Sequence, residues 1–202
     1  MKIQVMPETS RSALEALREP LETGRIRIAR AARQAEFPAR FQLVAAMNPC
    51  PCGHLGSGTR SCRCTPDQIK RYQARLSGPL LDRIDLHVGV NALPPGELLG
   101  TGAAESSATV RARCIAARSR AHARQGRINQ DLGPQELERH AHADDNALGF
   151  LRQAAERLGW SGRGLHRSLR VARTIADLDG AERIGTEHVA EALQYRPALA
   201  QP

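Results

Sequence analysis

The chain has 202 residues and a mass of 22.0 kDa, which leaves room for one ordinary domain or two small ones. Aromatic residues make up only 3% of it, so we expect an aliphatic, alanine-rich core. The formal charge of +8 and the pI near 10.0 favour a polyanionic partner, nucleic acid before membrane, since no amphipathic lysine-rich segment is present.

The basic charge has a second interpretation. Only Lys2 and Lys70 are lysines, so 27 of the 29 basic residues are arginine, a bias that a GC-rich genome produces without any binding function. No run of about 18 apolar residues occurs and the N-terminus lacks a signal-peptide core, which predicts a soluble, cytoplasmic protein without membrane contact. Its cysteines are then expected to be thiols or metal ligands and not disulfides.

The first predicted elements are a helix over residues 10–21 and a strand over residues 24–30. Ser10 is a suitable N-cap, and Pro20 is expected to bend or end the helix, whose apolar face carries Leu14, Leu17 and Leu21. The segment GRIRIAR alternates basic and apolar residues, which predicts a strand with an arginine-rich outer face, and it could form half of a hairpin.

An α/β arrangement is predicted for the middle of the chain. The apolar run from Phe41 to Met47 is typical of a strand buried on both faces of a parallel sheet. A Gly-, Cys- and Ser-rich loop over 48–65 follows it, then a helix from Pro66 and a second strand from Ile84 to Val90.

The remainder is predicted to be helical. Residues 92–104 are rich in Pro and Gly, so we place a linker there between an α/β domain over 1–91 and an all-α domain over 105–202. Capping residues and apolar spacing predict helices over 107–125, from Pro134, over 144–158, over 161–178, and from Thr186 to a point before Pro197.

The loop over 48–65 carries four cysteines in the pattern CxC, nine residues, CxC: Cys50, Cys52, Cys62 and Cys64. Four thiolates satisfy a closed tetrahedral Zn²⁺ site, which could fold a glycine-rich loop that has no core of its own. Free reduced cysteines, and a redox pair or iron–sulfur ligation, are the alternatives. His54 could replace one ligand but is expected to be exposed, and Cys114 is expected to be a small buried residue.

Three segments carry a family resemblance: AAMNPCPCG, CTPDQIKRYQARLSGPLLDRIDL and LRVARTIADLDG. They resemble the magnesium-chelatase-like AAA+ ATPases of the bacterial ComM type, over about residues 7–196. The resemblance implies a partial AAA+ core followed by an α-helical lid. It also implies a hexameric motor that uses ATP and Mg²⁺ and acts on branched or single-stranded DNA in recombination and natural transformation.

The sequence departs from that family in its nucleotide-binding motifs. No GxxxxGK[ST] loop occurs in the 202 residues, and the family's acidic pair would fall at Gln4 and Val5, which cannot bind magnesium. The chain is therefore expected to be a fragment or a truncated reading frame, of which we favour the fragment. Alone, it is expected not to hydrolyse ATP.

By the same resemblance, two residues would act on nucleotide from the α/β domain. Asn48 corresponds to sensor 1, which positions the attacking water, although an Asn before Pro49 is also ordinary turn chemistry. Arg83 corresponds to the arginine finger offered to a neighbouring subunit, with a surface salt bridge to Asp82 or Asp85 as the alternative.

The other arginines of interest are Arg163 and Arg170 in the lid and Arg25, Arg27 and Arg30 in the predicted hairpin. Arg163 corresponds to sensor 2, and Arg170 lies two turns further along the same face and could also bind phosphate; a solvated helix face is the alternative. The hairpin arginines are expected to contact the DNA backbone, unless they only protect an exposed strand edge.

Two other functions remain open. One is a non-enzymatic zinc-stabilised DNA-binding or assembly module, which would bind DNA without nucleotide. The other is a magnesium-chelatase subunit proper, against which the cysteine loop argues because the resemblance implies that chelatase motor subunits lack it.

Overall fold

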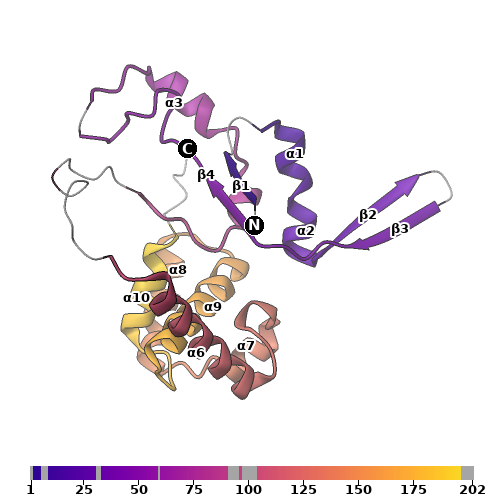
Figure 1. Cartoon of the computed structure of the whole chain (residues 1–202), viewed down its shortest axis with the longest axis vertical. Helices are drawn as coiled ribbons and strands as arrows, with labels where there is room; N and C mark the ends of the chain where they lie inside the picture. Colours follow the sequence, from indigo (N-terminus) through magenta and orange to yellow (C-terminus); the bar gives the residue numbers. More distant parts are fainter. Residues whose placement is uncertain are drawn as a thin grey trace. The chain divides into compact units, whose positions relative to one another are not determined.

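The computed structural model of the protein describes residues 2–5, 9–30, 33–58, 60–90, 96 and 104–196. The chain divides into two compact units (Figure 1). The first comprises Met1–Ile84 with Val90–Ala92, and the second Asp85–Gly89 with Leu93–Pro202. The predicted linker over 92–104 lies outside the described residues except at positions 96 and 104.

The first unit contains a parallel pair of strands, β1 (Lys2–Val5) and β4 (Leu43–Ala46). β4 confirms a strand within the run 41–47, but the prediction that it is buried on both faces is wrong. Leu43 and Val44 are half-buried, whereas Ala45 and Ala46 are exposed. Among the described residues β1 alone pairs with β4, so the sheet is too small to enclose it.

Two short helices, α1 (Arg11–Ala16) and α2 (Arg18–Thr23), replace the single helix predicted over 10–21. Ser10 caps α1 as predicted. The break falls at Leu17, one turn before the proline, because Pro20 has no N–H to donate to the carbonyl of Ala16.

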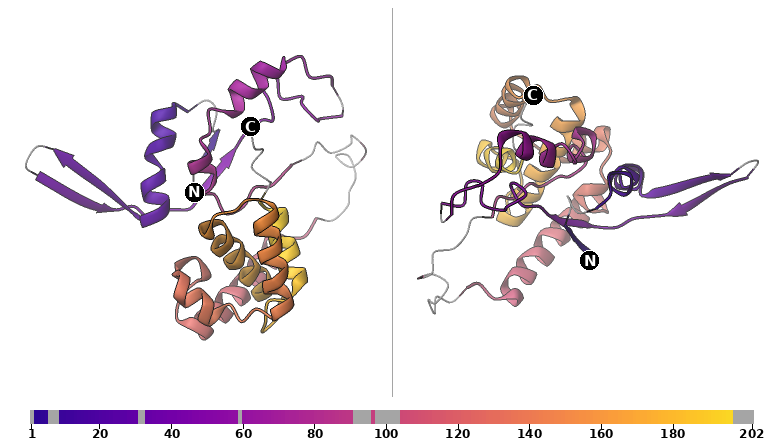
Figure 2. Two further views of the ribbon diagram at one scale, coloured as in Figure 1. Left: turned by 180° about the vertical axis from the view of Figure 1, so that it is seen from behind. Right: turned by 90° about the horizontal axis from the view of Figure 1, so that it is seen from above.

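The arginine-rich segment forms a hairpin, as the sequence allowed. Strand β2 (Arg25–Arg30) pairs antiparallel with β3 (Arg33–Pro38), and Arg27 lies opposite Glu36. Gly24, in the left-handed region at φ 69°, ends α2 and turns the chain into the hairpin. In both views of Figure 2 the hairpin extends away from the helices of its unit, and its described side chains are exposed.

The rest of the first unit is α3 (Pro66–Gln73) and α4 (Gly78–Leu81). Thr65 and Gln68 form a capping box that starts α3 where the sequence predicted it. Of the side chains described in this unit, Leu14, Leu76 and Leu80 form a small buried cluster.

The predicted strand over Ile84–Val90 is absent from the structure, which has an irregular segment there. Residues Asp85–Gly89 belong to the second unit, where the His87 N–H donates to the Tyr195 carbonyl over 2.8 Å. Leu86 and Val88 are 51% and 65% exposed. The alternation of apolar residues predicted a strand here, but among the described residues no other strand pairs with this segment.

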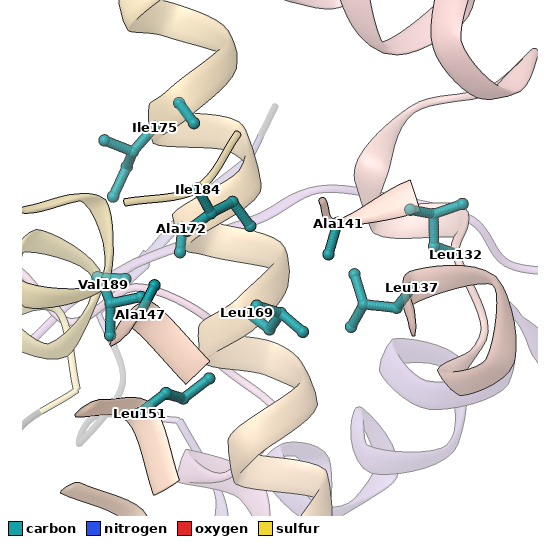
Figure 3. Packing of buried hydrophobic residues seen from close by; sticks show 12 residues of the cluster. Leu132, Leu137, Ala141, Ala147, Leu151, Leu169, Ala172, Ile175, Ile184 and Val189 are labelled. Carbon is teal, nitrogen blue, oxygen red and sulfur yellow. The ribbon is translucent and has the colours of Figure 1, made fainter. Parts of the chain in front are cut away.

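The second unit is built from helices around α9 (Gly162–Asp179). The other elements are α6 (Ser107–Gln125), the short 3-10 turn η2 (Asn129–Asp131), α7 (Pro134–His140), α8 (Asp145–Arg157) and α10 (Thr186–Gln194). These helices confirm the predicted ones to within a few residues. Figure 3 shows Leu169, Ala172 and Ile175 of α9 among apolar side chains of its neighbours.

The expectation that Cys114 is buried is wrong. It is exposed on α6, whose first buried residue is Ala117, followed by Ala121. The N-terminal half of α6 is exposed along its length. A small apolar residue in mid-helix was therefore not sufficient to predict burial.

A polar network lies inside the helical unit and was not anticipated. The Asp177 carboxylate accepts two hydrogen bonds from Arg124, of 2.6 and 2.9 Å, and others from Asn129 and Arg173, of 2.8 and 3.1 Å. Burial by itself would raise the pKa of Asp177, but the hydrogen bonds from Arg124 and Asn129 outweigh it and hold this pKa below its ordinary value.

Replacing this carboxylate by an amide is expected to destabilise the helical unit. In Asp177→Asn the buried Arg173 and the half-buried Arg124 lose their counter-ion, which costs about 3–5 kcal/mol. Because the folded pKa of Asp177 is lowered, its contribution is complete above about pH 4 and is lost as the pH falls below that value. Urea unfolding followed by Trp160 fluorescence, at pH 7 and below pH 4, measures both effects.

Trp160 is the only tryptophan and packs against the core of this unit, so its signal reports on the helices. The matched control is Glu138→Gln, which removes the same charge from the exposed face of α7 and should change stability by at most about 0.5 kcal/mol. Equal stability of Asp177→Asn and wild type at pH 7 would show that the network contributes nothing net.

Candidate metal centre and nucleotide-contacting residues

The four loop cysteines converge on one point. Their sulfur atoms all lie within 4.8 Å of one another, with Cys50 Sγ 3.4 Å from Cys52 Sγ and 3.7 Å from Cys62 Sγ. A disulfide requires about 2.05 Å, so these are separate thiols, as is Cys64. Two distant CxC pairs are therefore brought together by the fold of the loop.

This geometry fits a zinc ion. Four sulfurs at about 2.3 Å from a tetrahedral Zn²⁺ lie about 3.8 Å from one another, close to the 3.4–3.7 Å between Cys50, Cys52 and Cys62. All four protein ligands would be used, so no position stays open for substrate. The donor set suits a structural ion that holds a loop together and not a catalytic one.

The surroundings of the thiols already favour ionisation at two of them, since the pKa values of Cys50 and Cys52 are both lowered. Hydrogen bonds from the backbone of His54 and Arg63 lower the pKa of Cys52 to about 6. Burial, with the neighbouring cysteines, raises the pKa of Cys64 to about 12. Without a cation, four sulfurs at this spacing cannot all carry charge, and a divalent ion removes that conflict.

Asn48 lies just beyond the carboxyl end of β4 and is exposed. The parallel register pairs Gln4 with Ala45 and Val5 with Ala46, so the end of β1 is adjacent to this point. The two positions at which the resemblance places the family's acidic pair, Gln4 and Val5, therefore lie near Asn48 in the backbone. They carry an amide and an apolar residue, and neither supplies a carboxylate for Mg²⁺.

Arg83 follows α4 and its side chain is only 10% exposed. It is ion-paired with Glu22 of α2, a partner that was not weighed from the sequence, and donates to the Pro79 carbonyl over 2.6 Å. The guanidinium is thus held in place on the first unit. Its role as an arginine finger stays a prediction.

The two lid arginines differ in their surroundings. Arg163 is exposed in the first turn of α9, whereas Arg170 is half-buried and burial lowers its pKa. Between them Arg167, which the sequence did not single out, is buried and pairs with Asp85 over 2.6 Å. Arg163 and Arg170 both stay predictions as phosphate contacts.

Two of the hairpin arginines share one acidic partner. Arg25 and Arg27 both pair with Glu36 across the strands, the latter over 3.0 Å, and these pairs lower the pKa of the Glu36 carboxyl. Arg30 ends β2 opposite Arg33, and its side chain lies outside the described residues. DNA contact by these three residues also stays a prediction.

A groove beside the cysteines was missed from the sequence. Its volume is 710 Å³, and it is lined by Pro51, Cys52, Arg63, Cys64, Gln68, Arg71, Tyr72 and Arg75. The signal was present, since Gln68, Tyr72 and Arg75 are spaced i, i+4 and i+7 and so share a helix face. Nothing in the sequence places Arg63 opposite that face.

Comparison with known proteins defines the class. The family model of magnesium chelatase subunit ChlI matches residues 2–98, and that of the ChlI C-terminal part matches residues 104–196. The chain therefore belongs to the magnesium-chelatase-like family, as its motifs predicted.

Individual relatives narrow the resemblance to the ComM type. Competence protein ComM of Haemophilus influenzae is 50% identical over 192 residues, which cover 95% of this chain and 37% of that protein. Uncharacterized protein YifB of Escherichia coli is 46% identical over 192 residues, 95% of this chain and 38% of that protein. This chain thus spans less than two fifths of the length of these curated relatives.

None of the helices in the described part of the chain combines the length and apolar character that a bilayer crossing requires.

Proposed function

We propose that this chain forms the C-terminal portion of an ATP-driven, DNA-acting motor of the ComM type. The observation that carries the proposal is the 50% identity to a competence protein over 95% of the chain. The intact protein would be cytoplasmic and assemble into a hexameric ring on branched or single-stranded DNA during recombination and natural transformation.

In this proposal residues 1–91 belong to an AAA+ core, residues 92–104 are a linker and residues 105–202 are the lid. ATP, bound with Mg²⁺, would supply the phosphoanhydride whose hydrolysis drives movement. Asn48 would orient the attacking water, and Arg83 would stabilise the charge on the transferred phosphoryl group of a neighbouring subunit. Arg163 and, further along α9, Arg170 would contact phosphate from the lid.

The cysteine centre has a structural role in the same proposal. Among the side chains that the structure describes, the core cluster of the first unit has three buried residues, and the loop over 48–65 contributes Cys50 to the buried residues. A zinc ion on Cys50, Cys52, Cys62 and Cys64 would supply the cross-links that this loop lacks.

A chimera tests the proposal. The 37% of H. influenzae ComM that this chain matches is replaced by this chain, so that the rest of the relative supplies the phosphate loop and acidic pair that the family resemblance implies. We expect DNA-stimulated ATP turnover by the chimera and none by this chain alone, because no phosphate-binding loop occurs in its 202 residues. Phosphate release, with and without single-stranded or branched DNA, is the measurement.

The same experiment separates the competing functions. A chimera that binds DNA without nucleotide and never turns over ATP would favour a zinc-stabilised binding or assembly module, for which the convergent cysteines provide a scaffold. ATP turnover that DNA leaves unchanged would contradict a DNA motor and favour a chelatase-type subunit.

A further inference from the structure

We propose that the groove between the cysteine loop and α3, called here the arginine groove, binds single-stranded nucleic acid. Arg63, Arg71 and Arg75 would contact backbone phosphates and Tyr72 would stack on a base. The inference deepens the proposed function, because it names a second contact for the nucleic acid on which the motor acts.

The groove is formed by two segments that the fold brings together. Pro51, Cys52, Arg63 and Cys64 come from the cysteine loop, and the remaining lining residues come from α3 and the turn after it. The Gln73 side chain donates to the Pro49 carbonyl over 3.3 Å and ties the end of α3 to the start of the loop. The volume of the groove, 710 Å³, lies within the range of about 300–1,000 Å³ that is typical of ligand sites.

The charge of the groove fits an anion. Three of its lining residues are arginines and none is a carboxylate. Over residues 48–76 five basic residues face a single acid, Asp67. Four thiolates with a divalent ion carry a formal charge of −2, so even a zinc-loaded loop leaves this segment with about +2.

Tyr72 argues for nucleic acid over a simple anion. The chain has only two tyrosines, and this one is half-buried within the arginine-lined groove. Basic grooves that follow a phosphate backbone, with aromatic rings on which bases stack, are the recurring way to bind single strands without sequence preference. A duplex, whose bases are already stacked, would offer Tyr72 no free base face.

The metal centre forms one wall of this site. Cys52 and Cys64 line the groove, so the ligand set that fixes them also fixes Arg63 between Cys62 and Cys64. Chelation is therefore expected to weaken nucleic-acid binding, because it would release the loop that places Arg63 in the groove.

Binding is tested with the full 202-residue chain and a fluorescein-labelled single-stranded oligonucleotide of mixed sequence, by anisotropy over a range of salt concentrations. In Arg71→Gln/Arg75→Gln two phosphate contacts are lost, so the slope of log K against log salt should become less steep by about 1.4. Tyr72→Ala should weaken binding by about 5- to 150-fold and leave the slope unchanged. An abasic oligonucleotide of the same length should not distinguish Tyr72→Ala from wild type.

The matched control is Arg152→Gln/Arg157→Gln, which removes the same charge from exposed positions of α8 and should leave the salt slope unchanged. Circular dichroism and metal content confirm that each variant is folded. Failure of wild type to bind the oligonucleotide overturns the proposal, as does wild-type behaviour of both groove variants. Equal competition by polyglutamate, with no effect of Tyr72→Ala, would also overturn it by indicating an acidic protein partner.

The hairpin variant Arg25→Gln/Arg27→Gln separates this inference from the proposed function. If the hairpin variant loses oligonucleotide binding and the groove variants keep it, the proposal that the arginine groove binds nucleic acid is contradicted, but the proposal of a DNA motor is not. If binding depends on the groove residues but the chimera shows no ATP turnover, the motor is contradicted and the nucleic-acid site in the groove stands.

Discussion

Protein purified without chelator is expected to contain about one zinc ion per chain, measured by elemental analysis. The reason is the sulfur cluster, whose spacing matches that of four thiolates around a tetrahedral ion. Structural zinc in small domains contributes about 10–16 kcal/mol of apparent binding free energy, so its removal should unfold the loop over 48–65. Limited proteolysis after chelation should cut inside that loop.

Thiol titration gives an independent reading of the same state. Of the five cysteines Cys114 alone is exposed. Zinc-loaded protein should therefore have one thiol that reacts rapidly with the titrating reagent, and chelated protein should have five such thiols. Cys52→Ser should lose the metal, whereas Cys114→Ser should keep it and lose the fast thiol. Five fast thiols with no metal would refute the site, and stoichiometric iron with visible absorption would replace zinc by an iron–sulfur cluster.

Arg83→Ala in the chimera is expected to lower kcat for ATP by about 10³- to 10⁵-fold, the contribution of an arginine finger to phosphoryl transfer. Arg83→Lys should recover little of this loss, because an ammonium lacks the planar fork that matches phosphate oxygens. Nucleotide binding should change far less than kcat, since a finger acts on the charge that develops in the transition state. Single-turnover hydrolysis and nucleotide titration separate the two quantities.

Glu22→Gln is the control for this variant, because it breaks the same ion pair and keeps the guanidinium. It should retain most of the turnover if Arg83 acts on nucleotide. If Glu22→Gln and Arg83→Ala lose activity equally, Arg83 serves as a structural partner of α2. If neither variant loses activity, the assignment of Arg83 as an arginine finger is wrong.

The helical unit could be predicted from the sequence because its signals are local. Ser106, Asp144 and Ser161 cap α6, α8 and α9 within one residue of the predicted starts of these helices, and Gly180 ends α9 in the left-handed region. Each cap depends on residues within one turn of it. The hairpin was also accessible, since alternation over Arg25–Arg30 is set by strand geometry alone.

The errors arose where the outcome depends on distant residues. Leu86 and Val88 alternate as a strand does, but the segment instead pairs His87 with Tyr195, 108 residues further along. Cys114 lies on the same helix face as the buried Ala117, yet it is exposed, so burial of that face begins only at Ala117. The arginine groove required Arg63 to meet α3, and only the folded loop brings them together.

Glu36 bears on how strongly the hairpin can attract a polyanion. It binds Arg25 and Arg27 at once, although their side chains remain 63% and 75% exposed. A phosphate that approaches either arginine must compete with a carboxylate already in position, so the hairpin's effective charge is smaller than its arginine content suggests. In the proposed DNA contact, phosphate would have to displace the Glu36 carboxylate from Arg25 or Arg27, which would make the contact weak and rapidly reversible.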